Sequence, residues 1–250
     1  MVSLVHAELR KLLGLPTAWI GLVVGLVAAP ALAVLNAPAA RRAVADGLIR
    51  DPSDLGFQDL GIGLLGAMIL GVVAVSSEFT PTGDDTPGAR QLTATLLAAP
   101  RRTRLLAAKA IALSLVVAAQ GLVTAVATLA LTERMHGALV PPPQPGRVLA
   151  AVLYWTLLGL LAWSITLLAR NGMITLAVLI VNSTVVSLSY LLTKVTPWAA
   201  YLPDIVGAHM FLRGMDVPVE IPPVTAGLVM TAWVAALIAV ATLTFHRRDA

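Results

Sequence analysis

Six apolar runs, each long enough to cross a lipid bilayer, constrain this chain more than any other feature. They cover residues 17–35, 60–77, 107–131, 148–169, 172–192 and 223–244. A membrane-spanning helix needs about 20 apolar residues, and helices satisfy their own backbone hydrogen bonds in lipid. One ionisable residue lies within the runs, Lys109, whose long side chain we expect to reach the headgroups. The sequence therefore predicts an all-α membrane protein with six transmembrane helices in a single domain, residues 1–250.

The composition supports the same class of protein. Hydrophobic residues make up 58% of the chain and charged residues 12%, whereas soluble domains are about 25% charged. The net charge is +4, but the basic residues lie beside apolar runs, so we expect membrane lipids as neighbours and no nucleic acid. The chain has no cysteine, which excludes disulfides and thiolate metal sites.

The segment before the first run, residues 2–13, predicts an amphipathic helix lying in the membrane interface. On a helix, its apolar residues gather on one side, with Ser3, His6, Arg10 and Lys11 opposite. A signal peptide cleaved after "ALA" at 31–33 is the alternative. The apolar run is longer than usual for a signal peptide and five further runs follow it, so we favour the interfacial helix.

Lysine and arginine counts in alternate loops indicate the orientation. With both termini cytoplasmic, the inside segments hold ten of these residues and the outside loops seven. The densest cluster, Arg101, Arg102 and Arg104, then lies in the cytoplasmic loop 78–104. In that loop, "ARQLTATLLAA" predicts a short helix within 88–99, which ends at Pro100. The outer stretch 197–212 is apolar but broken by Pro203, which is compatible with a re-entrant or interfacial hairpin.

Signatures of enzymes and of ion coupling are missing. A nucleotide-binding P-loop needs glycine before its lysine, and none of the three lysines follows a glycine. The four histidines occur singly, as hydrogen-bonding or interfacial residues rather than metal ligands. Ion-coupled transporters usually carry an ionisable residue at membrane depth, and the central parts of these runs carry none. The sequence predicts no catalytic site, no metal and no resident cofactor.

Small residues recur every four positions in the first two runs. Gly21 and Gly25 lie in the first run, and Gly63 and Gly71 in the second. Such ridges permit close approach of helix backbones. The contacts they predict are either within the chain or at a dimer interface.

Three polar residues of the fifth run, Thr175, Asn182 and Ser189, are spaced seven apart. On a continuous helix they would share one face. This stripe is either hydrogen-bonding between helices or the lining of a translocation path.

Several motifs, in order along essentially the whole chain, resemble those of the type-2 ABC transporter permease family, in a form common in actinobacteria. They are "AELRKLLGLPTAWI", "SSEF", "ATLLAAPRRTRLLAAKA", "YLPDIVGA" and "HRRDA". One difference is the stretch "TPTGDDTPGARQ", which is longer than the family's short Gly-Thr turn and alters the shape expected of the ATPase contact.

This resemblance implies one half of a bacterial cell-membrane exporter. The chain would pair with a second permease subunit, identical or related, and with separate ABC ATPase subunits that bind ATP and Mg²⁺. The helix within 88–99 would be the coupling helix, with Glu78 and Arg90 near the contact and Arg101, Arg102 and Arg104 flanking it. Residues 197–212 would form the family's outer re-entrant pair.

An apolar path without fixed charge would suit a hydrophobic or amphiphilic cargo. Two other functions stay open from the residues. One is a secondary transporter, for which a buried charge would be the discriminating feature. The other is a non-transporting membrane scaffold or assembly factor.

Overall fold

The computed structural model describes residues 1–49, 52–77, 102–182, 187–215 and 217–248. Every regular element in these ranges is helical, which confirms the all-α prediction. The elements are α1 (Val2–Leu13), α2 (Pro16–Ala45), η1 (Pro52–Asp54), α3 (Leu60–Ser76), α5 (Arg102–His136), η2 (Gly137–Leu139), α6 (Pro145–Ala169), α7 (Gly172–Ile180), α8 (Leu188–Thr193), η4 (Pro197–Tyr201), α9 (Pro203–Ala208) and α10 (Pro223–Arg248).

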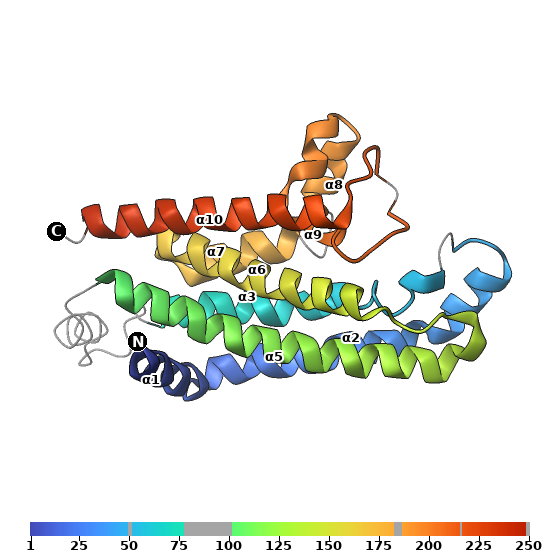
Figure 1. Ribbon diagram of the computed structural model, residues 1–250, viewed down its shortest axis with the longest axis horizontal. Helices are drawn as coiled ribbons and strands as arrows, with labels where there is room; N and C mark the ends of the chain where they lie inside the picture. Colours follow the sequence, from blue (N-terminus) through green and yellow to red (C-terminus); the bar gives the residue numbers. More distant parts are fainter. Residues whose placement is uncertain (50–51, 78–101, 183–186, 216, 249–250) are drawn as a thin grey trace.

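Four of the described helices are long and apolar enough to cross a membrane. They are α2, α5, α6 and α10, and α3 is a shorter apolar helix of 17 residues. The long helices run along a common direction in an elongated bundle, with both chain termini at one end (Figure 1). We call this the terminal end, and the end with η1 and η2 the opposite end. The chain is therefore a helical membrane protein.

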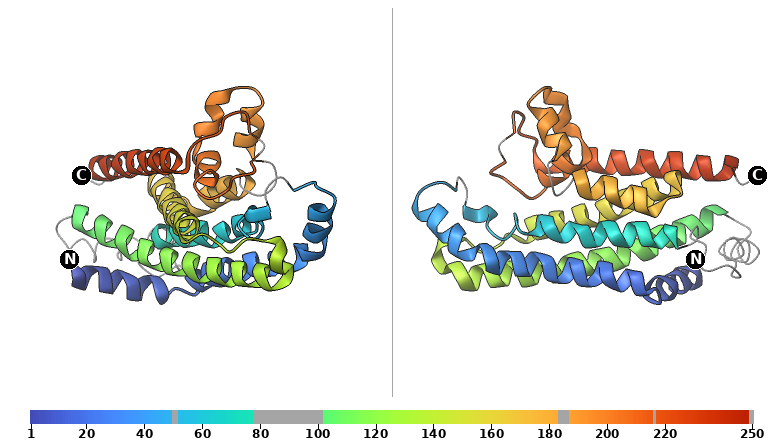
Figure 2. Two further views of the ribbon diagram at one scale, coloured as in Figure 1. Left: turned by 45° about the vertical axis from the view of Figure 1, so that its right-hand side comes forward. Right: turned by 180° about the vertical axis from the view of Figure 1, so that it is seen from behind.

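Helix α6 forms the centre of the bundle, where it contacts α3, α5, α7 and α10 (Figure 2). Its side chains Trp155 and Trp163 are fully buried. These large rings need small neighbours on the facing helices. A Cβ atom on Gly63 of α3 would lie 2.6 Å from Trp155, and one on Gly71 would lie 2.2 Å from the Gly159 backbone oxygen. Both glycines thus serve contacts within the chain.

The glycine ridge of α2 also packs inside the chain, against α3 and α5. A Cβ atom on Gly21 would lie 3.0 Å from Ile69, and one on Gly25 would lie 2.1 Å from the Gln120 side chain. The Gln120 amide donates to the Gly21 carbonyl at 2.9 Å, and Thr124 donates to the Gly25 carbonyl at 3.0 Å. The bare backbone of α2 therefore accepts interhelical hydrogen bonds from buried side chains of α5.

The predicted continuous fifth helix, 172–192, is wrong. Helix α7 ends at Ile180, and the chain leaves helical geometry at Ser187 before α8 begins. Figure 1 shows α8 directed away from the bundle direction. Ser187 accepts a hydrogen bond from the Tyr190 backbone, so a polar side chain starts a new helix instead of continuing the old one.

Candidate functional site

A cavity of about 190 Å³ lies near the opposite end of the bundle, between α3, α6, α9 and the segment after α7. Its walls are mainly apolar, from residues such as Phe57, Leu64 and Ile205. Polar side chains converge on it from four segments of the chain: Gln58, Tyr154, Asn182, Ser187 and Asp204. A mainly apolar hollow with a small number of polar side chains is typical of a small-molecule site.

The Asp204 carboxylate is the charged group of this cavity. One of its oxygens accepts hydrogen bonds from the Asn182 amide at 3.1 Å and from the Ser187 hydroxyl at 3.0 Å. The buried Tyr154 hydroxyl approaches the Asp204 backbone carbonyl at 3.4 Å. Both side-chain donors are uncharged, and no ion pair involves Asp204 within the described part of the chain. This arrangement can receive a cationic group or further hydrogen-bond donors.

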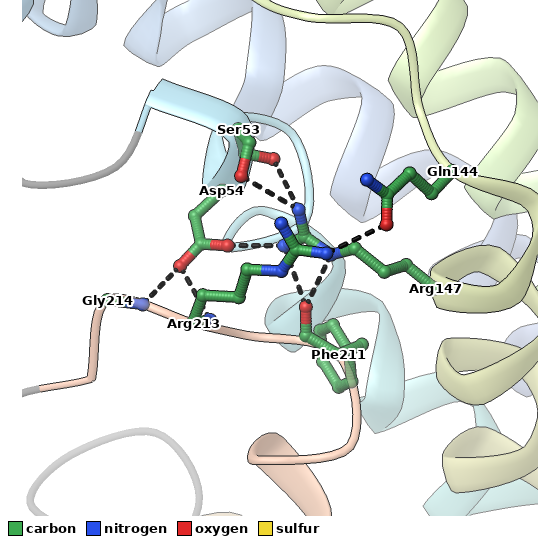
Figure 3. A network of polar contacts seen from close by, with 7 residues as sticks. All are labelled: Ser53, Asp54, Gln144, Arg147, Phe211, Arg213 and Gly214. Atoms are coloured by element: carbon green, nitrogen blue, oxygen red, sulfur yellow. Dashed lines mark hydrogen bonds and ion pairs between the residues drawn. The ribbon is translucent and has the colours of Figure 1, made fainter. Parts of the chain in front are cut away.

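A buried arginine beside the cavity joins three distant segments (Figure 3). Arg147, 8% exposed at the start of α6, forms an ion pair with Asp54. It donates to the Ser53 carbonyl and hydroxyl at 3.0 and 2.9 Å, and to the Phe211 carbonyl at 3.0 and 2.7 Å. Its guanidinium also lies 4.2 Å from the centre of the Phe57 ring. The structure tolerates this buried charge because the guanidinium N–H donors have an ion-pair partner and hydrogen-bond acceptors.

The other Asp54 oxygen fixes the loop after α9. It accepts hydrogen bonds from the Arg213 and Gly214 backbone amides at 2.9 and 2.7 Å. The Arg213 side chain in turn donates to the Gln144 amide oxygen at 2.8 Å. The network, which we call the Asp54–Arg147 clamp, holds Phe211 against the cavity. We interpret the clamp as a positioning element for that wall.

A second buried ion pair lies at the terminal end. The Lys109 ammonium contacts the Glu8 carboxylate at 2.7 Å, and Lys109 is only 5% exposed. The expectation that Lys109 reaches outward to headgroups is therefore wrong: Glu8, on the amphipathic helix α1, attracts the ammonium inward. The pair fixes α1 against the first turns of α5.

The predicted polar stripe does not form. Thr175 is buried, and its hydroxyl donates to the Asn171 carbonyl of its own helix. Ser189 is buried on α8, which is a separate helix. Of the three, Asn182 lines the cavity and donates to Asp204, whereas Thr175 and Ser189 do not line it.

The predicted ATPase-contact residues Glu78, Arg90 and Arg101 lie outside the described residues, as does the predicted helix within 88–99. The backbone of Arg102 begins α5, and Arg104 is exposed near the same end.

Sequence reasoning missed Asp54, Arg147 and Asp204, which lie outside the six apolar runs. A signal existed for Asp204, because its carboxyl interrupts the apolar stretch "WAAYLPDIVGAHMFL". The partners of Asp54 lie 93 and 159 residues away in sequence, and no local pattern indicates them.

The buried histidines behave as hydrogen-bonding residues. The Nδ1 atoms of His136 and His209 lie 3.0 and 2.9 Å from carbonyl oxygens of their own helices. No group of three metal-ligating residues occurs in the described ranges.

Comparisons with protein-family models, curated proteins and solved structures find no match for this chain.

Proposed function

We propose that this chain is the permease subunit of an ABC transporter, which moves an amphiphilic cargo across the cell membrane with ATP hydrolysed by a separate subunit. The observation that carries the proposal is the Glu8–Lys109 ion pair at the terminal end. It joins the amphipathic helix α1 to α5, the helix that directly follows the segment 78–101. A force applied to that segment would act on α1 and α5 together.

The position of the ion pair along α5 favours such a transfer of motion from the segment 78–101 to α1 and α5. Lys109 lies seven residues after the start of α5, a rise of about 10 Å, so the ion pair lies close to the end of the helix that would receive the force. Helix α1 leads within three residues into α2. Because α2 and α5 are joined by the Gln120 and Thr124 hydrogen bonds, a displacement would reach both helices. Transmission of this kind needs packed, rigid elements.

The cavity beside Asp204 supports an amphiphilic cargo. The sequence indicated a path without fixed charge, but Asn182 and Asp204 line one hollow together. A cargo with an apolar body and a cationic or hydrogen-bond-donating group would match the apolar walls and the carboxylate. A purely hydrophobic cargo would leave Asp204 desolvated without a new partner, which costs free energy.

Asp204 also favours a second candidate function, an ion-coupled secondary transporter. A carboxyl group beside a cavity can bind a proton or cation during transport. The two functions differ in their energy source. Proteoliposomes that contain this chain alone would accumulate cargo along an ion gradient only if it is a secondary transporter.

The first experiment is purification of the tagged protein in mild detergent from its own cells. Mass spectrometry identifies co-purifying proteins, and ATP hydrolysis is measured on the eluate. The test variant is Arg101→Glu with Arg102→Glu. The matched control is Arg247→Glu with Arg248→Glu, which makes the same charge change at the end of α10.

We expect a P-loop ATPase to co-purify with the wild type and the control, and to be lost or uncoupled in the test variant. A well-folded wild type that brings no ATPase would overturn the proposal in favour of a scaffold or secondary transporter. Equal ATPase recovery and activity in both double variants would remove the role of Arg101 and Arg102 while keeping the partner.

A further inference from the structure

A second, larger hollow lies between α6 and α10 near the opposite end of the bundle. Its volume is about 580 Å³. Aliphatic side chains line it, among them Leu149 and Leu153 on α6 and Val224 and Leu228 on α10. Val224 is 77% exposed and Leu228 67% exposed, so the groove opens sideways toward the surroundings of the bundle. On a membrane helix, that surface faces lipid.

The charged and amide groups of this groove gather at one end. Gln144 and Arg213 lie there, where α6 begins and the connection to α10 passes (Figure 3). The Arg147 guanidinium, at the same end, is already engaged with Asp54, Ser53 and the Phe211 carbonyl. Arg213 is the exposed cation of the groove.

The charge of Arg213 is not neutralised by a carboxylate in the described ranges. Its side chain donates to Gln144, an uncharged amide. Glu220 lines a neighbouring hollow with Arg213, but no ion pair between the two occurs. A guanidinium with free donors suits a phosphate, which it can bind through two parallel hydrogen bonds.

The groove also has the length of a lipid tail segment. From Gly146 to Leu153, and from Val224 to Thr231, each helix advances about 10 Å at 1.5 Å per residue. One leaflet of the hydrocarbon core is about 15 Å deep, half of the roughly 30 Å total. The apolar part therefore fits within a single leaflet, with Arg213 at the headgroup end.

We propose that this groove is a binding site for an anionic phospholipid, with one acyl chain between α6 and α10 and the phosphate on Arg213. The polar end and apolar length match the two parts of a phospholipid. The uncompensated charge favours a lipid with net negative charge over a zwitterionic one. The site does not depend on an ATPase partner.

The test is native mass spectrometry of the delipidated full-length protein titrated with phosphatidylglycerol or with phosphatidylcholine of the same chains. Arg213→Gln removes the headgroup cation. Gly227→Leu places a side chain in the lining of the groove, where a Cβ atom would meet only Met210, at 3.6 Å. Arg134→Gln, an exposed arginine near the end of α5, is the charge-matched control.

We expect one tightly bound phosphatidylglycerol on the wild type and on the Arg134→Gln control. Arg213→Gln should weaken it at least tenfold, because the cation that binds the phosphate is lost, and Gly227→Leu should weaken both lipids. Equal binding of the two lipids by the wild type, or unchanged affinity in both groove variants, would overturn the proposal. A Gly227→Leu protein that changes from dimer to monomer would also overturn it, because the groove would then belong to an interface between copies.

Discussion

Removal of Lys109 should strongly destabilise the protein, because it would leave the Glu8 carboxylate buried without its cation. The side chains are 5% and 10% exposed and their charged atoms lie 2.7 Å apart. Breaking a buried ion pair from one side typically costs about 3–5 kcal/mol. For a chain of this length, each kcal/mol lowers Tm by about 2–4 °C, so Lys109→Met should lower Tm by roughly 6–20 °C.

Thermal unfolding in detergent, followed by circular dichroism, measures this effect. The double variant, Glu8→Leu with Lys109→Met, removes both charges and should recover most of the lost stability, because well-packed apolar replacements of buried pairs are often neutral or stabilising. Lys194→Met is the control, since this exposed lysine contacts the Tyr190 ring at 4.8 Å and should change stability by less than about 1 kcal/mol.

The reasoning fails if the two single changes are additive. A double variant as unstable as the sum of Lys109→Met and Glu8→Leu would mean that the charges do not stabilise one another. In that case α1 would be held by its apolar contacts alone, and the transfer of motion proposed above would lose its physical basis.

Two further changes test the packing and the loops. Gly71→Ala should lower the free energy of unfolding by about 1–3 kcal/mol or more, because its Cβ would lie 2.2 Å from the Gly159 backbone oxygen. Gly61→Ala, whose Cβ would have no atom within 4 Å, should be neutral or slightly stabilising in the same melting assay. Equal losses of stability in the two variants would refute the close packing. Burial raises the pKa of Asp59 above its usual 3.8. The protonated carboxyl therefore stabilises the folded state fully below about pH 4, and this stabilisation is lost as pH rises through the raised pKa. Asp59→Asn should therefore flatten the dependence of Tm on pH in this window and stabilise the protein at pH 7, and an unchanged pH profile would contradict this.

The sequence predicts most helices well where one physical cause dominates. Continuous apolar composition leaves the backbone no partner except itself, so residues 60–77 and 148–169 fall closely on α3 and α6. The amphipathic pattern of residues 2–13 matches α1. The same reasoning failed at 172–192, because hydropathy does not reveal that the Ser187 hydroxyl accepts a hydrogen bond from the Tyr190 backbone amide and so begins a new helix.

The candidate sites were much less accessible to sequence reasoning. The sequence identifies Asn182 as a polar residue in an apolar run, but its partner Asp204 lies outside the six runs, within the predicted re-entrant stretch 197–212. The Asp54–Arg147 contact joins residues 93 positions apart. A charge count treats such residues as solvated, and only their folded positions show that they are buried.

By itself, the sequence determined the class of protein, because long apolar runs cannot be satisfied in water and can be satisfied as helices in lipid. The tertiary structure decided which glycines face which helices, where the fifth run breaks, and which charges pair. The local hydropathy pattern of a sequence indicates only the average environment of a segment. Pairing of Glu8 with Lys109 or of Asp54 with Arg147 depends on the relative position of distant helices, which is fixed by how their side chains pack together.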